Sequence, residues 1–187
     1  MTSDAGLSAR IGRWSTGRIA FAALAVFVAF TGTVLPAQAA RARAIFGSAG
    51  SPDTSFLYTA ADLYRMAEAY GDAGRAAYIH ARFTFDVIWP LVYTLFLVTA
   101  ISWLFRKALP AESRWQRLNL LPFLGMGFDF LENVGASLVM ARYPAQTPVV
   151  DSLTPVFTLV KWVGVNGSFA VVVAGVVIVA WQRVRRG

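Results

Sequence analysis

The sequence contains no cysteine and a single histidine, and each scarcity removes a class of chemistry. Without cysteine, structural disulfides, thiolate catalysis and cysteine metal sites are excluded. His80 alone does not make a multi-histidine metal centre. The chain also lacks a phosphate-cradling glycine loop, a nucleophile elbow and an H-E-x-x-H helix. We therefore expect neither a metal site nor a cofactor.

Charged residues are also scarce, since they make up 14% of the chain, against about 25% in an ordinary soluble domain. Hydrophobic residues reach 57%. Four apolar stretches are long enough to cross a bilayer core, which takes about 20 helical residues. The predicted spans are residues 18–36, 83–105, 118–141 and 153–181. The pattern predicts an all-α fold, a four-helix transmembrane bundle that forms a single domain over residues 1–187.

The net charge of +7 is unevenly distributed along the chain. Basic residues gather before the first predicted span, in the link 106–117 between the second and third spans, and after the fourth. The other loops carry nearly balanced charges. Because positively charged loops stay in the cytoplasm, both termini are predicted to be cytoplasmic. The same distribution argues against nucleic acid as the partner.

The first span has a second interpretation. Basic residues, an apolar stretch and then "LPAQAA" (35–40) are typical of a signal peptide cleaved after Ala39. The apolar run of about 17 residues exceeds the usual core of such peptides, which is roughly 7–15 residues long. We therefore expect a retained helix, whereas cleavage would leave three spans in the same orientation.

The long segment between the first two spans is more than a simple connector. Its first part, "ARARAIFGSAGSPD", contains Gly, Ser and Pro residues that predict irregular structure. Asp53, Thr54 or Ser55 can then cap a helix over about 54–70 that stops at Gly71. Apolar residues recur in it at helical spacing, so we expect an external amphipathic helix over the outward end of the bundle.

The stretch "GMGFDFLENVG" (125–135) places ionisable side chains inside the third predicted span. Asp129, Glu132 and Asn133 fall on one face of a helix that turns about 100° per residue. An ionisable group at the centre of the bilayer costs at least about 2.5–3.5 kcal/mol, so such groups face the bundle interior and find partners there. We therefore expect this face to point inward.

The partners of this face can be inferred from depth. A helical rise of about 1.5 Å per residue, counted from the span ends, brings Tyr93, Glu132 and Lys161 to one level. This predicts an ion pair between Lys161 and Glu132, with Tyr93 and Asn133 hydrogen-bonding around it. Arg82 and Asp86 lie four residues apart near the outer surface and are predicted to pair along the helix.

Two interpretations of these charges remain open. In the first, they neutralise one another and only fix helix packing. In the second, the three carboxylates at membrane depth outnumber their cations, since Arg82 serves Asp86 and Lys161 serves one of the other two. Asp129 is then left to hold a proton. Asp129, Glu132 and Lys161 become candidates for acid/base catalysis or proton transfer.

These residues predict a cavity that opens outward and binds a small amphipathic or lipid-like molecule. Arg75 and Arg82 lie near its mouth and are candidates to hold an anionic headgroup. Trp89 and Trp162 are candidates to line it and to stack on a ligand. The remaining predicted ligand-binding residues are Asp86, Tyr93 and Asn133.

Other functions also fit the pattern. The cavity could serve an acid/base enzyme, or the protein could be a proton-coupled carrier or a pore subunit, alone or as a homo-oligomer. Apolar residues such as Phe123 and Phe128 on the far side of Asp129 argue against a polar path through the bundle. A third possibility is a structural protein that assembles with a membrane-protein partner.

Five short motifs occur in order over residues 57–162: "YGDAGRAAY", "FDVIWPLVY", "DFLEN", "RYP" and "LVKW". Together they resemble a group of small bacterial four-span integral membrane proteins that carry no assigned activity. The resemblance implies a place in the bacterial cytoplasmic (inner) membrane and groups the motifs into one site. Four-span lipid- or sterol-binding isomerase-like proteins also place acidic residues in a membrane cavity, but that likeness is analogy alone.

Overall fold

The computed structural model describes residues 3–186, which are helical and contain no strand. In chain order the elements are α1 (Ser3–Trp14), α2 (Gly17–Phe46), η1 (Gly47–Ala49), η2 (Pro52–Thr54), α3 (Ala60–Arg82), α4 (Phe85–Ala108), η3 (Arg114–Leu120), α5 (Leu121–Arg142) and α6 (Val150–Val184). The prediction of an all-helical fold is confirmed.

Three helical stretches of the described chain are long and apolar enough to cross a membrane. They are Gly17–Ala49, Ala60–Ala108 and Val150–Val184. α5 is not among them, and it is the helix that carries Asp129 and Glu132. A membrane location is therefore consistent with the structure, while the fourth span remains a prediction.

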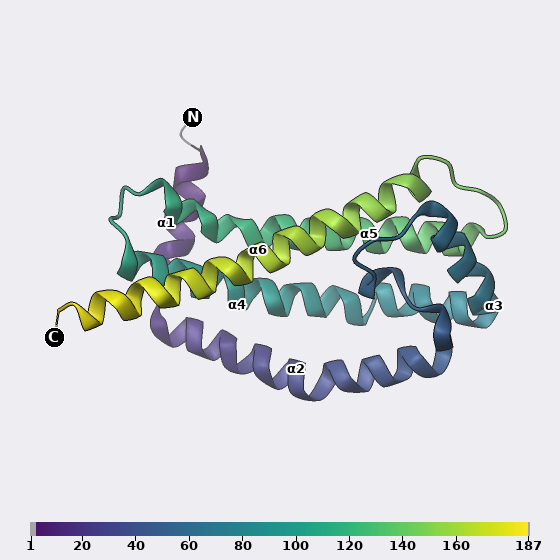
Figure 1. Cartoon of the computed structure of the whole chain (residues 1–187), viewed down its shortest axis with the longest axis horizontal. Helices are drawn as coiled ribbons and strands as arrows, with labels where there is room; N and C mark the ends of the chain where they lie inside the picture. The colour runs from purple at the N-terminus through teal and green to yellow at the C-terminus, as the bar shows by residue number, and fades with distance from the viewer. Residues whose placement is uncertain (1–2, 187) are drawn as a thin grey trace.

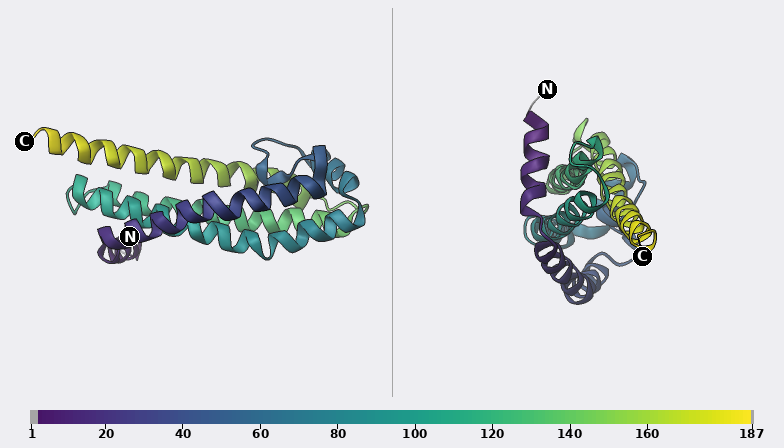
Figure 2. Two further views of the ribbon diagram at one scale, coloured as in Figure 1. Left: turned by 90° about the horizontal axis from the view of Figure 1, so that it is seen from below. Right: turned by 90° about the vertical axis from the view of Figure 1, so that its left-hand side faces the viewer.

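The helices that run along the long axis of the molecule are α2, α4, α5 and α6 (Figure 1). α5 packs against α6 and α2 packs against α4. α1 lies at one end, roughly perpendicular to this axis, and the end of α6 lies there too (Figures 1 and 2). We call this the terminal end. α3 and the segment 47–59 lie at the opposite end, which we call the α3 end.

α2 is longer than the predicted first span and continues through Pro36 to Phe46. The side chain of Thr16 accepts a hydrogen bond from the Ile19 amide at its start, and Gly47 closes its other end with a φ of 56°. The prediction of irregular structure was therefore wrong for residues 40–46, whereas residues 47–53 contain only short 3-10 turns and non-helical residues. Alanine and arginine favour helices, and they dominate residues 40–46.

α3 begins at Ala60 and not near residue 54, as the sequence predicted. The cap is Thr59, whose side chain accepts from the Asp62 amide while the Asp62 carboxylate accepts from the Thr59 amide. This is a capping box. The helical direction breaks at Gly71, where φ is 61°, in agreement with the predicted stop. Helical structure then resumes and continues to Arg82.

The close contact between α5 and α6 depends on small residues. A Cβ atom added at Gly164 would lie 3.0 Å from the Cα and backbone nitrogen of Gly125. A Cβ atom added at Gly125 would lie 2.9 Å from a methyl group of Val165. The two backbones therefore touch at this level, as in other helix pairs that use small residues to approach closely in a membrane.

Apolar clusters lie on both sides of the residues that form the site. Toward the α3 end, Leu63 and Tyr78 of α3 pack with Met140 of α5. Toward the terminal end, Leu97 of α4 packs with Val165 of α6. The ionisable residues described below are therefore placed between two apolar layers.

We expect Gly164→Ala to lower the stability of the folded protein by about 1–3 kcal/mol, because the added methyl group meets backbone atoms that cannot move aside. Gly127→Ala is the matched control on α5, where a Cβ atom has nothing within 4 Å. Thermal unfolding of both variants in detergent measures the difference. Equal melting temperatures for the two variants would contradict the close α5–α6 contact.

Candidate functional site

Lys161 of α6 points into the bundle, with 3% of its side chain exposed. Its ammonium lies 2.5 Å from a carboxylate oxygen of Glu132 on α5 and 2.7 Å from an oxygen of Asp53 in η2. Glu132 is fully buried. The predicted Lys161–Glu132 ion pair is therefore confirmed. The second partner, Asp53, was not predicted.

Arg82, at the end of α3, makes a second pair of contacts. One of its terminal nitrogens lies 2.7 Å from a carboxylate oxygen of Asp86 on α4, which confirms the predicted pair. The other lies 3.5 Å from the second carboxylate oxygen of Asp53. The guanidinium also lies 4.7 Å from the centre of the Tyr78 ring, a cation–π distance. Asp53 thus joins the lysine and the arginine into one ion network.

Asp129 is the acid of this network that is farthest from a cation, since it lies 3.9 Å from the Lys161 ammonium. The Tyr93 hydroxyl donates to Asp129 over 2.9 Å, and the Asn133 amide donates to it over 3.5 Å. The same amide donates to the Asp86 carbonyl over 3.3 Å. Tyr93 and Asn133 therefore donate hydrogen bonds to Asp129, and not to the Lys161–Glu132 pair as predicted.

The network is acidic when all its members are ionised. Its four carboxylates, Asp53, Asp86, Asp129 and Glu132, share only Arg82 and Lys161 as cations. Like charges this close disfavour ionisation together. Such a network therefore binds protons or a cationic group more readily than a network with equal numbers of acidic and basic groups.

Asp53 lies in the short segment η2, whereas the other members of the network lie in α3, α4, α5 and α6. Burial by itself would raise the pKa of its carboxyl group, but the positive charges of Lys161 and Arg82 lower that pKa well below the ordinary value of 3.8. Asp53 is therefore ionised at neutral pH. Its charge holds η2 against the bundle.

The oxygens of Asp53, Asp129 and Glu132 lie within 4.8 Å of one another, which is the spacing of a cation site. The position among them is taken by the Lys161 ammonium, which contacts all three carboxylates at 2.5–3.9 Å. A metal ion would have to displace this ammonium. The expectation that the protein holds no metal stays a prediction.

A pocket of about 380 Å³ opens beside the network at the α3 end. Its polar part includes Asp53, Arg82 and Asp86, which are members of the network. Its apolar part comes from α2 and the start of α4. Apolar lining residues are Leu35, Ala39, Ala42, Ile45, Phe46 and Phe85. The pocket therefore joins an apolar wall to ionisable groups.

Of the predicted site residues, only Arg82 and Asp86 line this pocket. The predicted residues that do not line it are Asp129, Glu132, Lys161, Tyr93, Asn133, Arg75, Trp89 and Trp162. Arg75 forms an ion pair with Asp72 and donates a hydrogen bond to the Ala67 carbonyl over 2.8 Å. Among the described residues, no hydrogen bond or ion pair brings it to Arg82. Trp89 stacks on Phe27 and Phe30 of α2. The Trp162 ring lies 5.2 Å from the Lys161 ammonium. The prediction that Arg75 lies with Arg82 at the mouth was wrong.

Sequence reasoning missed Asp53 because its position depends on how the loop between α2 and α3 returns to the bundle. The sequence offers Asp53, Thr54 and Ser55 as alternative helix caps, yet the Asp53 carboxylate pairs with cations from α3 and α6. The one available signal is that Asp53 is the single acid of the segment 47–59. Tyr58 was missed for the same reason, and its hydroxyl lies 2.8 Å from that of Thr158 on α6.

Lys161→Met should lower the stability of the fold by about 3–5 kcal/mol, because it leaves buried carboxylates without their cation. Lys107→Met is the matched control, since Lys107 is the only other lysine and is exposed. Glu132→Gln should lower the stability by less, because the Lys161 ammonium keeps its ion pair with Asp53. Unfolding temperatures of the three variants in detergent measure this order. An unchanged stability for Lys161→Met would contradict the central role of the ammonium.

The contribution of Asp53 should depend on pH in a defined direction. Because the pKa of Asp53 is lowered in the folded state, its stabilising contribution is complete above the ordinary value of 3.8 and is lost as the pH falls below it. The parent should unfold at a higher temperature than Asp53→Asn at pH 7. This difference should shrink as the pH falls through the range of about 4 to 2. A constant difference across that range would contradict the ion pairs of Asp53.

Comparison with known proteins gives no name to this arrangement. No family model matches the chain, and no curated protein or solved structure matches it either. The resemblance to small bacterial four-span proteins therefore stays a prediction. A function is therefore inferred from the geometry of the ion network and the pocket beside it.

Proposed function

We propose that the protein is a membrane protein that binds a small amphipathic or lipid-like molecule in the pocket beside the ion network. One observation carries the proposal: the pocket wall contains Asp53, Arg82 and Asp86, and these residues belong to the buried network. A ligand with an apolar body would lie against α2. Its polar end would meet the charged groups. Sites of this kind are mostly apolar with a few placed polar groups.

The proposal includes an orientation in the bacterial cytoplasmic membrane. α5 would act as a fourth span, and both termini would lie in the cytoplasm. The terminal end carries the basic residues of the link 106–117 and of the C-terminal segment, in line with the positive-inside rule. The α3 end, with the pocket, would then face outward.

Asp129 would handle a proton within this site. Four carboxylates share two cations, so at least one carboxylic acid is favoured over a fully ionised network. Asp129 lies farthest from a cation, and Tyr93 and Asn133 fix its orientation. With Glu132 and Lys161 beside it, the same group could support acid/base chemistry on a bound molecule.

A proton-coupled carrier or pore is less well supported. Such a protein needs a polar path from the network to the terminal end. On that side the backbones of α5 and α6 touch at Gly125 and Gly164, and Leu97, Ile101 and Leu104 of α4 are buried in apolar clusters. The site is therefore better suited to binding from the α3 end than to transfer across the bundle.

A bulky side chain that fills the pocket should prevent ligand binding without replacing a charged residue. Ala42 of α2 lines the pocket, whereas Ala40 is exposed and does not. We expect Ala42→Phe to lose an amphipathic molecule that survives gentle purification with the parent and with Ala40→Phe. Mass spectrometry of the extracted small molecules measures this. The same molecules in equal amounts in all three proteins would favour a structural role for the charges.

Replacing Asp129 tests the proton separately. Asp129→Asn keeps the shape of the side chain. Its oxygen can still accept from the Asn133 amide while its NH2 group donates to the Tyr93 hydroxyl, so we expect the unfolding temperature of the variant to stay close to that of the parent. Once the ligand is known, its affinity for the parent should depend on pH, and this dependence should be absent or reduced in Asp129→Asn. If both proteins show the same pH profile, Asp129 does not handle the proton.

A further inference from the structure

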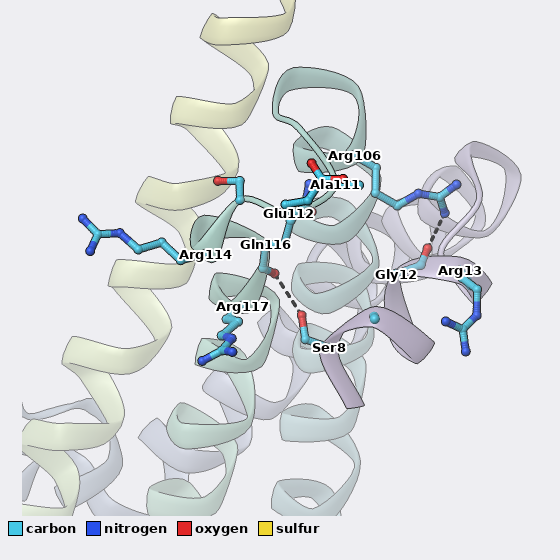
Figure 3. Close-up of a pocket in the computed structure, with 11 residues that line it drawn as sticks. Ser8, Gly12, Arg13, Arg106, Ala111, Glu112, Arg114, Gln116 and Arg117 are labelled. Carbon is cyan, nitrogen blue, oxygen red and sulfur yellow. Dashed lines mark hydrogen bonds between the residues drawn. The ribbon is translucent and has the colours of Figure 1, made fainter. Parts of the chain in front are cut away.

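A second pocket lies at the terminal end, where α1 meets the link between α4 and α5. Its volume is about 480 Å³. Four arginines line it: Arg13 of α1, Arg106 of α4, and Arg114 and Arg117 of η3. Glu112 is its one acidic lining residue. Figure 3 shows Arg13 and Arg106 on the α1 side of the pocket and Arg114 and Arg117 on the η3 side. The ion network lies at the other end of the bundle, so this pocket is separate from it.

The pocket is held in place by contacts between α1 and the bundle. The Asn119 amide donates to the Ser8 carbonyl over 3.1 Å, and the Ser8 hydroxyl donates to the Gln116 carbonyl over 3.2 Å. Arg106 donates to the Gly12 carbonyl. α1 is therefore fixed against η3 and α4. The pocket therefore has fixed walls, while its four arginine side chains are exposed and point in different directions (Figure 3).

The other side of α1 is mainly apolar. Leu7, Ile11 and Trp14 line a groove beside α4, together with Leu95 and Val98, and Arg10 lies at the same groove. Leu7 and Trp14 remain 53% and 77% exposed. A short helix with exposed apolar side chains and two arginines, Arg10 and Arg13, set across the end of a bundle (Figure 2), has the form of a helix that lies in the plane of a membrane surface.

We propose that the four-arginine pocket binds the phosphate headgroup of an anionic phospholipid. With α1 in the plane of the membrane surface, its apolar side meets hydrocarbon and the pocket lies at the level of the headgroups. Arginine binds phosphate oxygens through parallel N–H donors. Basic pockets between helices on the cytoplasmic side are a known form of headgroup site. The exposed apolar side of α1 favours a lipid over free phosphate or nucleic acid as the occupant.

Competition between lipids tests the site on the full chain in detergent. Native mass spectrometry would measure bound dioleoylphosphatidylglycerol relative to dioleoylphosphatidylcholine, supplied in equal amounts. We expect the parent to prefer the anionic lipid. The triple variant R13Q/R114Q/R117Q should reduce this preference by about tenfold or more, because each basic residue contributes to the attraction of anionic lipid. Arg106 is left unchanged because it holds α1.

The matched control removes three charges from the same end of the molecule but outside the pocket. R183Q/R185Q/R186Q should keep the preference of the parent, since these residues do not line the pocket. R13K/R114K/R117K should keep most of it, because a lysine also attracts phosphate.

Three results would overturn the proposal. The first is an unchanged preference in the glutamine variant, with its unfolding temperature close to that of the parent. The second is an equal loss in both glutamine triples, which would indicate a diffuse charge effect. The third is release of the anionic lipid by inorganic phosphate, which would assign the pocket to the free ion.

Discussion

The Lys161 ammonium is the contact on which the arrangement of the described helices depends. It lies between Glu132 of α5 and Asp53 of η2, so one charge ties together the two helices with the closest backbone approach and the segment that leads into α3. Removing a charge from a buried pair costs far more than the pair itself contributes, because the remaining partner stays buried and unpaired. The network therefore stabilises this fold mainly by raising the free energy of other helix arrangements, in which a buried charge would lose its partner.

Small residues and charges act at different levels of the same helix pair. Gly125 and Gly164 bring the backbones of α5 and α6 together on the terminal side of the network, and Gly135 lies close to Thr154 on its other side. The close approach leaves little space between the helices except where Lys161 and Glu132 are placed. The position of the ammonium is thus set by a backbone contact on the terminal side and by the contact of Gly135 with the Thr154 side chain on the α3 side. Precise placement of ionisable groups is what a binding site requires.

Helical periodicity and rise were sufficient to predict the contacts made between regular helices. They correctly paired Lys161 with Glu132 and Arg82 with Asp86, because the face and the depth of a residue on a long helix follow from its number. They did not predict the contacts of Asp53, because the position of Asp53 depends on the path of an irregular segment. They also misplaced Arg75, because its local partners Asp72 and Ala67 hold it away from the pocket. The extension of α2 to Phe46 could have been expected from its alanines and arginines.

In the proposed arrangement with α5 as a fourth span, the charge pair between α5 and α6 also bears on how the chain would enter a bilayer. α5 is not among the helices that are long and apolar enough to cross a membrane, and it carries Asp129 and Glu132. The cation that compensates them is on the next helix to be synthesised. An uncompensated acid in hydrocarbon is costly, so insertion of α5 is favoured once α6 is present beside it. The two helices are then expected to leave the translocation machinery as a hairpin and not one after the other.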